Sequence, residues 1–275
     1  MSNLETDPAE LDCRGDADAA TSGSGPLHVE VLTARDVPLG GPRAMTVHRT
    51  LPQRSRSLIG SWCFVDHYGP DDVSQTGGMD VPPHPHTGLQ TASWLFTGEI
   101  EHRDTMGNHA MVRPGELNLM TAGHGIAHTE VSTPDTTILH GVQLWIALPA
   151  EAADTPRDFA HHRPDDVVVG GVRAKVFLGD LLGVRSPVHT FTPLLGAQLD
   201  LEPGALVEID VDPASSTASS STPARSASTA PTPRRWSGPN SATSVSGRRI
   251  SRSATSATGR RASSCSAAPR SARTS

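Results

Sequence analysis

The segments His84-Pro85-His86 and His128-Thr129-Glu130 each carry two metal-binding side chains, two positions apart. Successive side chains of a β-strand point to opposite faces, so residues at i and i+2 share one face. If the two segments are neighbouring strands, their four donors converge on one point. Three imidazoles and a carboxylate suit a divalent first-row transition metal, and they leave two positions of an octahedron open, as a catalytic metal requires.

The sequence around these segments indicates an all-β fold. From Leu27 to about Asp212, short alternating pieces rich in Val, Leu, Ile and Thr are separated by Gly and Pro, and no long window has helical periodicity. Many short strands predict a sandwich or a barrel, in which inward side chains can bind one metal and one ligand. The predicted strands are residues 28–33, 44–50, 90–96, 100–104, 109–112, 117–121, 138–147, 172–178 and 205–211.

The predicted strand 138–147 has a clear alternation. Val142, Leu144 and Ile146 alternate with Gln143 and Trp145. We therefore expect the aliphatic face to lie in a packed interior.

Charge is distributed unevenly along the chain. Residues 1–212 contain all 29 acids and 13 of the 23 bases, near −16, whereas residues 213–275 contribute ten arginines and no acid, near +10. The acidic part argues against direct contact with nucleic acid. Cys13, Cys63 and Cys265 are odd in number and widely spaced, which argues against a disulfide framework or a thiolate zinc site and favours a reducing, cytoplasmic location.

The two ends differ from the middle of the chain. Residues 1–26 are polar and acidic, without the features of a signal peptide, and are predicted to be a disordered leader. No stretch approaches the roughly 20 apolar residues of a membrane-spanning helix, so no membrane partner is expected. Residues 213–275 contain 19 Ser and ten Arg among 63 residues, too little apolar surface to offset chain entropy, and are predicted to be disordered.

Two interpretations of this tail stay open. It is an arginine-rich arm for nucleic acid or acidic partners, or it is the product of a reading-frame shift in a gene of high GC content. The abrupt change of composition at the end of a predicted strand favours the shift.

Several motifs resemble those of the pirin family of the cupin superfamily. The resemblance runs from about residue 27 to about residue 211, and residues 175–192 are similar to the family's lead-in to a second cupin domain. The motifs are His84-Pro-His-Thr-Gly88, Gly98-Glu-Ile-Glu-His-Arg-Asp-Thr-Met-Gly-Asn108, Arg113-Pro-Gly-Glu116, Met120-Thr-Ala-Gly-His-Gly-Ile-Ala-His-Thr-Glu130 and His140-Gly-Val-Gln-Leu-Trp145.

The resemblance implies a fold and a ligand set. It implies cupin β-barrels, the N-terminal one over residues 27–150, then a linker and the start of a C-terminal one over 151–212, whose barrel is incomplete if the frame shift is real. It implies His84, His86, His128 and Glu130 as metal ligands. The expected ion is iron(II), with Mn, Ni, Cu or Zn as alternatives.

The resemblance also implies two functions. Some pirin-like proteins are similar in activity to quercetin 2,3-dioxygenases, which open the central ring of a flavonol with dioxygen and release carbon monoxide. A small aromatic substrate would then bind the metal through its 3-hydroxyl, and Glu130 would accept the proton as the catalytic base. Candidate walls for the substrate are Leu89, Trp94, Phe96, Met106 and Met120. The alternative is a non-enzymatic, metal-containing regulator that binds a protein partner.

The remaining histidines have weaker assignments. The pair His161-His162 is predicted to lie in a solvated loop. His102, His109, His124 and His140 either accept a hydrogen bond from a metal-bound histidine or have plain structural roles.

Overall fold

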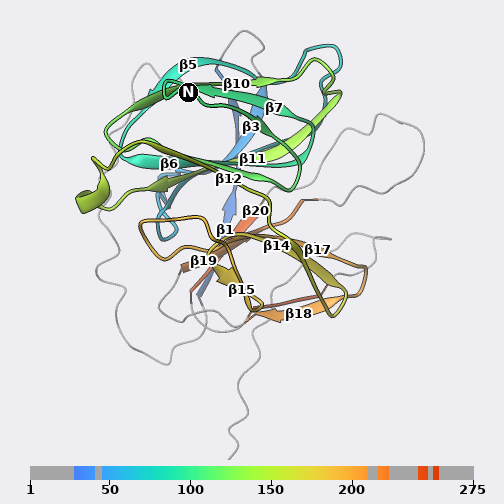
Figure 1. Ribbon diagram of the computed structural model, residues 1–275. Coiled ribbons are helices and arrows are strands. Elements are labelled where there is room, and N and C mark those ends of the chain that lie inside the picture. The colour runs from blue at the N-terminus through green and yellow to red at the C-terminus, as the bar shows by residue number, and fades with distance from the viewer. Residues whose placement is uncertain (1–27, 41–44, 210–215, 223–240, 247–249, 254–275) are drawn as a thin grey trace, which may run out of the picture.

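The computed structural model describes residues 28–40, 45–209, 216–222, 241–246 and 250–253 (Figure 1). Within these ranges the chain forms β-strands, with one short 3-10 helix, η1 (Ala150–Ala152). The all-β class predicted from the sequence is confirmed. The predicted leader, residues 1–26, lies outside the described residues. No helix in the described part is long and apolar enough to cross a membrane.

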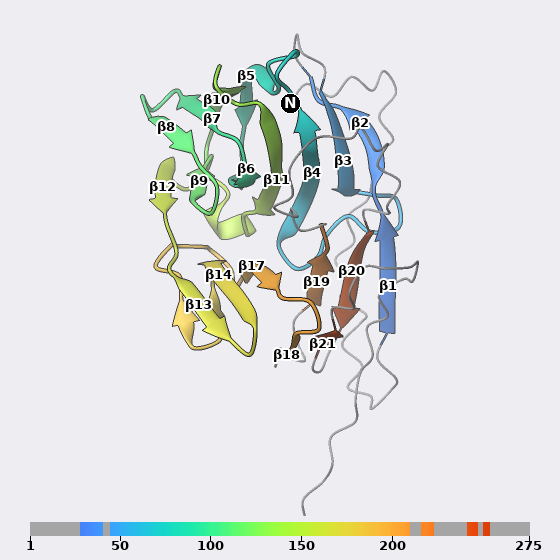
Figure 2. The same ribbon diagram turned by 90° about the vertical axis from the view of Figure 1, so that its right-hand side faces the viewer.

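The N-terminal half is built on a seven-stranded antiparallel sheet (Figure 2). In spatial order its strands are β12 (Asp158–His162), β9 (Leu117–Thr121), β6 (Leu89–Thr97), β11 (Ile138–Ala147), β4 (Trp62–Asp72), β3 (Thr46–Leu51) and β2 (Arg35–Pro38). Residues 90–95 of β6 are buried without interruption. Burial of both faces means that the sheet is covered on both sides.

A smaller sheet covers one face of the large sheet. Its strands are, in spatial order, β5 (Asp80–His86), β10 (Ile126–Ser132), β7 (Ile100–Asp104) and β8 (His109–Val112). The strand β5 contains Pro82, Pro83 and Pro85, which cannot donate backbone hydrogen bonds; it can hold them because it lies at the edge of its sheet. The two sheets are paired separately, so the predicted barrel takes the form of a cupin-type β-sandwich.

Apolar side chains from both sheets fill part of the space between them. Burial of each such side chain stabilises the fold by roughly 1.5–3 kcal/mol. The cluster consists of Leu39, Val47, Tyr68, Val73, Met79, Val81, Leu95, Ile100, Val112 and Leu139. Polar side chains occupy the adjoining part of the same space.

The outer face of the large sheet is covered by strands from the C-terminal half. These are β14 (Val172–Leu178) and β17 (Gly196–Leu201), which form one sheet with β13 (Asp166–Val169). The small hairpin β15 (Asp180–Leu181) and β16 (Val184–Arg185) follows β14 in the chain. The ring of Trp94 stacks on Phe177 with centroids 4.4 Å apart, and its Nε1 donates a hydrogen bond to Gln198 Oε1 at 2.8 Å. The large sheet is therefore the central layer of the molecule.

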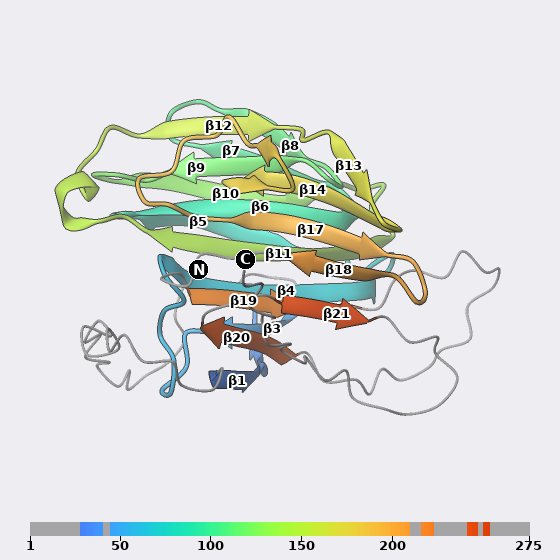
Figure 3. The same cartoon turned by 90° about the horizontal axis from the view of Figure 1, so that it is seen from below.

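Three strands lie in the tail that was predicted to be disordered. The strand β20 (Ser241–Ser246) pairs with β1 (His28–Thr33) and with β19 (Ser216–Ser220), and β21 (Ile250–Ser253) pairs with β18 (Leu206–Ile209) (Figure 3). These strands are not what the composition led us to expect. The rest of 213–275 lies outside the described residues, so the prediction for the tail as a whole stays a prediction.

Strand pairing crosses the predicted domain boundaries. The strand β1, predicted as part of the N-terminal cupin of residues 27–150, pairs with β20 of the tail. The strand β12, predicted as part of the 151–212 segment, pairs with β9 of the large sheet. The division into domains stays a prediction.

Candidate metal centre

The two segments that opened the sequence analysis are neighbouring antiparallel strands. On β5 and β10, His84 lies directly opposite His128, and His86 lies opposite Ile126. The register shifts by a bulge between His128 and Glu130. A bulge re-aims side chains locally, so the carboxylate leaves its strand at a different angle from the imidazole two residues before it.

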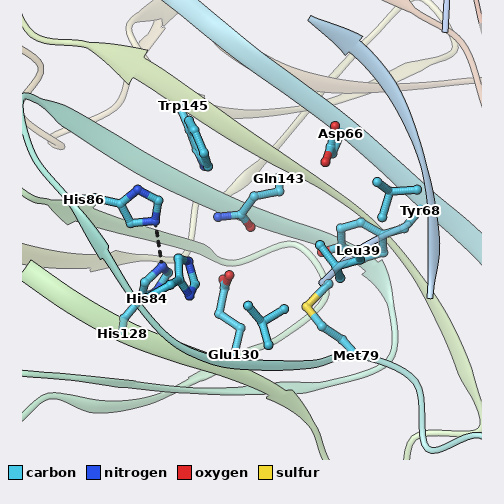
Figure 4. A pocket seen from close by; sticks show the side chains of 12 residues that line it. Leu39, Asp66, Tyr68, Met79, His84, His86, His128, Glu130, Gln143 and Trp145 are labelled. Atoms are coloured by element: carbon cyan, nitrogen blue, oxygen red, sulfur yellow. Dashed lines mark hydrogen bonds between the residues drawn. The ribbon is translucent and has the colours of Figure 1, made fainter. Parts of the chain in front are cut away.

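The three imidazoles converge on one point inside the sandwich (Figure 4). Donor atoms of His84, His86 and His128 lie within 4.8 Å of one another, and all three side chains are buried. Nε2 of His86 lies 3.1 Å from Nε2 of His128. Two nitrogens bound at right angles to one ion, each at about 2.1 Å, are about 3.0 Å apart, so this pair fits an edge of an octahedron.

Hydrogen bonds set the orientation of two of these rings. Nδ1 of His84 donates to the carbonyl oxygen of Pro82 at 2.9 Å, which leaves Nε2 with its lone pair. Nδ1 of His128 lies 3.3 Å from Nδ1 of His102, whose Nε2 lies 3.4 Å from Oδ2 of Asp104. If His128 donates to His102 and His102 donates to Asp104, the Nε2 lone pair of His128 faces the cluster. Such outer partners are typical of metal-bound histidines.

The cluster strongly favours neutral imidazoles. Burial lowers the pKa of His84. Burial, together with repulsion from His128 and then His84, lowers the pKa of His86 to about 3. Burial, with repulsion from His84 and His102, lowers the pKa of His128 to about 2. Neutral imidazoles with converging lone pairs are the donors that a divalent transition metal requires.

Glu130 lies beside this triad and has a partner from the large sheet. Its carboxylate forms a second donor group with His128 and His102, within the same 4.8 Å limit. Ser93 Oγ lies 2.9 Å from Glu130 Oε1 and 2.9 Å from Gln143 Oε1. A hydroxyl has one proton and can donate to only one of them at a time. A carboxylate offers about four lone-pair sites, so Glu130 keeps acceptor capacity for a metal or for a substrate proton even when it accepts from Ser93.

A small cavity separates the cluster from the large sheet (Figure 4). Its volume is about 20 Å³, enough for an ion or a single water. Its walls come from both sheets and include both polar and apolar side chains. They are Leu39, Val47, Asp66, Tyr68, Met79, Val81, His84, His86, His128, Glu130, Gln143 and Trp145.

Comparison with known proteins places the chain in a family. The pirin family model matches residues 44–146. A Pseudomonas aeruginosa protein named "Putative quercetin 2,3-dioxygenase PA1205" is 47% identical over 180 residues, which cover 65% of this chain and 56% of that protein. The crystal structure of a quercetin 2,3-dioxygenase from Acinetobacter baumannii matches with a TM-score of 0.70 and 31% identity, over 82% of this chain and 75% of the other. The chain belongs to the pirin family.

This pirin spans only part of its curated relatives. A pirin-like protein of Caulobacter vibrioides is 39% identical over 184 residues, 63% of this chain and 62% of that one. The matched region thus covers 56% and 62% of the length of these two relatives. The resemblance read from the motifs is confirmed, together with the cupin fold.

An ion pair borders the cavity of this pirin on the side of the large sheet. Arg49 donates from Nε and Nη2 to the two carboxylate oxygens of Asp66, each at 2.8 Å. Burial raises the pKa of Asp66, and the hydrogen bonds and charge of Arg49 oppose that rise. The two-pronged contact partly offsets the cost of burying the Asp66 charge.

The substrate walls expected from the sequence are not the walls of this cavity. Trp94 packs in the cluster on the outer face of the large sheet, where Phe96 also packs, and Met106 is 44% exposed. Met120 belongs to a separate cluster with Ala122 and Ile126. Leu89 does not line the cavity either.

The expectation that the aliphatic face of β11 lies in a packed interior is confirmed, but this interior is the outer cluster and not the site. Gln143 and Trp145 line the cavity, whereas Val142 and Leu144 pack against the outer cluster with Ile146. Both faces of the strand are covered, so alternation alone could not say which face meets the site. Asp66 and Tyr68 on β4, spaced at i and i+2, carried the same signal and were not recognised.

The other histidines fall outside the triad. His102 lies beside His128, in keeping with the expectation that it is a hydrogen-bond partner of a metal-bound histidine. His109 instead pairs with Glu101 on the surface. Nδ1 of His124 lies 3.3 Å from the carbonyl oxygen of Thr155. His161 lies on β12 and not in a loop, where its Nδ1 is 2.6 Å from Asn118 Oδ1.

Proposed function

We propose that this pirin is a metal-dependent dioxygenase of the quercetin 2,3-dioxygenase type, acting on a flavonol or a related phenolic. His84, His86, His128 and Glu130 are the proposed metal ligands, and iron(II) is the proposed ion. The observation that carries the proposal is the buried convergence of three imidazoles with low pKa values beside a carboxylate. The names of the relatives and of the A. baumannii structure support the type of chemistry.

The side chains of the proposed metal centre have different roles. A divalent ion held there lowers the pKa of a coordinated hydroxyl and supplies redox chemistry. His84, His86 and His128 fix its position, and Glu130 accepts the proton of the substrate hydroxyl as general base. Ser93 orients the Glu130 carboxylate through its hydroxyl. Trp145, whose ring meets His86 edge to face at 4.9 Å, offers a flat apolar surface next to the ligands.

One observation favours the alternative, a metal-containing regulator that binds a protein partner. The cavity of about 20 Å³ is far smaller than the roughly 300–1,000 Å³ of pockets that hold drug-sized ligands. A flavonol enters only if wall side chains move. A regulator needs no such movement.

Oxygen uptake separates the two functions. We expect the full chain, loaded anaerobically with Fe(II), to consume dioxygen and release carbon monoxide in proportion to quercetin added, and the metal-free chain to do neither. Glu130→Gln should lose most of this rate because the amide cannot accept the proton. Tight metal binding without turnover over a broad panel of phenolics would establish the regulator and reject the enzyme.

Metal analysis tests the ligand set directly. His128→Ala should retain only a small fraction of the metal that the wild type holds, because His128 belongs to both donor groups. The matched control is His109→Ala, which removes an exposed imidazole on β8 and should leave the metal content unchanged. Retention of one full equivalent by His128→Ala would overturn the assignment.

A cytoplasmic location is part of the same proposal. It is in keeping with three widely spaced cysteines and with oxidation-sensitive iron(II) as the proposed ion. Fractionation of cells that express the chain tests it, and recovery from an oxidising compartment would contradict it.

A further inference from the structure

The only tyrosine of the chain, Tyr68, has a buried hydroxyl without a hydrogen-bond partner in the part of the chain that the structure describes. Tyr68 lies on β4 and is 1% exposed. No hydrogen-bond partner for its Oη is found among the described residues. Buried hydroxyls are nearly always paired, and an unpaired one is unfavourable. We therefore look for its hydrogen-bond partner in a molecule bound in the cavity.

The neighbouring strand leaves room for this hydroxyl. A Cβ placed on Gly141 of β11 would lie 2.8 Å from Tyr68 Oη. Gly141 lies two residues before Gln143, which lines the cavity from the same strand. The absence of a side chain at Gly141 leaves the room that the Tyr68 hydroxyl occupies over β11, and Tyr68 is one of the residues that line the cavity.

The ring is placed across the cavity from the imidazoles. In Figure 4, Tyr68 lies with Leu39 and Met79 on one side, His84, His86 and His128 lie on the other, and Glu130 lies between. The aromatic ring itself packs in the apolar cluster, where phenylalanine would pack as well. Only the hydroxyl distinguishes the two residues at this position.

The hydroxyl remains a donor throughout the physiological range. Burial raises the pKa of Tyr68 well above its ordinary value, and the negative charges of Glu130 and Asp66 raise it further. The hydroxyl therefore stays protonated and can donate a hydrogen bond to an acceptor oxygen.

We propose that Tyr68 Oη is a ligand-binding group that donates a hydrogen bond to an oxygen of the molecule bound in this cavity. The inference rests on the proposed function and narrows its substrate class. The ligand carries one oxygen toward the imidazoles and a second acceptor oxygen, a carbonyl or a phenolate, on the side of Tyr68. The rival occupant is one water molecule, for which the cavity volume of about 20 Å³ suffices.

The melting temperature of the ligand-free chain shows whether the Tyr68 hydroxyl is unpaired or is hydrogen-bonded to a resident water. Tyr68→Phe should melt at the same temperature as the wild type or higher, since it removes a hydroxyl that makes no bond. The matched control is Ser186→Ala, which removes a buried hydroxyl that donates to Phe177 O at 2.8 Å and should lower the melting temperature. A fall for Tyr68→Phe as large as that of the control would show a resident water and overturn the inference.

Binding to the Zn(II)-loaded chain tests the ligand contact without turnover. Loss of one hydrogen bond should raise the dissociation constant of quercetin about tenfold in Tyr68→Phe. Phenol, whose single oxygen binds the metal and which has no second acceptor for Tyr68, should bind both chains equally, and both should hold the same amount of zinc. An unchanged constant for quercetin in Tyr68→Phe would overturn this inference alone. Failure of the wild type to bind quercetin would contradict the proposed function and, with it, this inference.

Discussion

Burial divides the histidines of this chain into groups with different chemistry. Besides the triad of the metal centre, His67 and His140 form a second buried pair, with their Nε2 atoms 3.0 Å apart. This pair lies beside Phe96, and Oγ1 of Thr222 lies 3.0 Å from Nε2 of His140. Burial lowers the pKa of His67 and of the three imidazoles of the triad, so single residues should make the stability of the fold depend on pH.

His67 provides a measurable case. Burial, with repulsion from His140 and then His48, lowers its pKa to about 4. In the unfolded chain the imidazole has a pKa near 6.5. Between pH 6.5 and pH 4 it therefore binds a proton in the unfolded state but not in the folded state. The free energy of unfolding falls as the pH falls through this range. We expect His67 to contribute about 2 kcal/mol of this loss between pH 7 and pH 5. Urea unfolding of the wild type and His67→Gln at both pH values should show it; equal losses in the two chains would contradict it.

His102 should act on the metal through His128. Its Nδ1 lies 3.3 Å from Nδ1 of His128, and Asp104, its other neighbour, accepts from Asn108 Nδ2 at 2.8 Å. His102→Phe removes the acceptor that orients His128 while keeping a ring of similar shape. We expect a 10- to 100-fold weaker affinity for Zn(II), roughly the effect of losing such outer partners. Competition with a chromophoric chelator measures it, and an affinity equal to that of wild type would exclude an orienting role.

At the scale of elements, the centre depends on how β5 and β10 are held side by side. Each strand is next to a turn that contains glycines, and Gly88 N donates to Gly123 O at 2.8 Å, which joins the two turns. Both glycines have positive φ, 64° at Gly88 and 51° at Gly123. The two positions differ in their surroundings, because a Cβ on Gly88 meets nothing within 4 Å whereas a Cβ on Gly123 overlaps the carbonyl oxygen of Thr155.

These two glycines form a matched pair for mutation. Gly88→Ala should destabilise the fold by about 1–2 kcal/mol, from the left-handed backbone alone. Gly123→Ala should destabilise it more and also reduce metal content, since β10 can form only if the turn before it moves away from Thr155. Chemical unfolding and metal analysis of both variants give the comparison. Equal effects of the two substitutions would show that the contact with Thr155 does not position β10.

At the scale of the whole molecule, the C-terminal half packs against the large sheet around Trp94 but leaves apolar side chains exposed on β13. Trp94 and Phe177 are both buried where they stack, and Gln198 accepts a hydrogen bond from the same tryptophan. By contrast, Val168 is 64% exposed and Val169 is 48% exposed on β13, an edge strand. Exposed apolar residues on an unpaired edge favour association with other chains.

We therefore predict lower solubility for this chain than for the longer P. aeruginosa relative. The measurement is the soluble fraction after expression, followed by size-exclusion chromatography and calorimetric melting of both proteins. Val168→Lys should raise the soluble fraction by charging the β13 edge. A soluble monomer that melts cooperatively without this substitution would contradict the prediction. Resequencing the end of the coding region would decide whether the tail reflects a frame shift.

The sequence predicted the positions of several strands of this molecule, but not which strands and side chains lie next to one another in the fold. The strands Ile100–Asp104 and Leu117–Thr121 have the bounds that were predicted. The strand β4 was not predicted, because Gly69 and Pro70 interrupt its pattern and Asp66, Asp71 and Asp72 are unusual in strands. Asp66 became recognisable only once its partner Arg49, 17 residues earlier in the chain, was seen across the sheet.

The same limit applies to the candidate site. The pairs at i and i+2 located His84, His86, His128 and Glu130 on neighbouring strands, because the donors of each pair are close in sequence. Tyr68 and Gln143 come from the opposite sheet, and only tertiary packing brings them to the cavity. Whether a polar strand residue faces a site or solvent is decided by what covers its face, and this is not encoded in the strand itself.

The tightness of the cavity has a kinetic consequence. If a three-ring phenolic binds there, part of the wall must rearrange before or during its entry, and that step does not speed up with ligand concentration. Stopped-flow traces for quercetin should then reach a limiting rate at high concentration, while catechol, being smaller, should reach a higher one. The selectivity of the centre would in that case depend on how fast a molecule is admitted as well as on how tightly it is held.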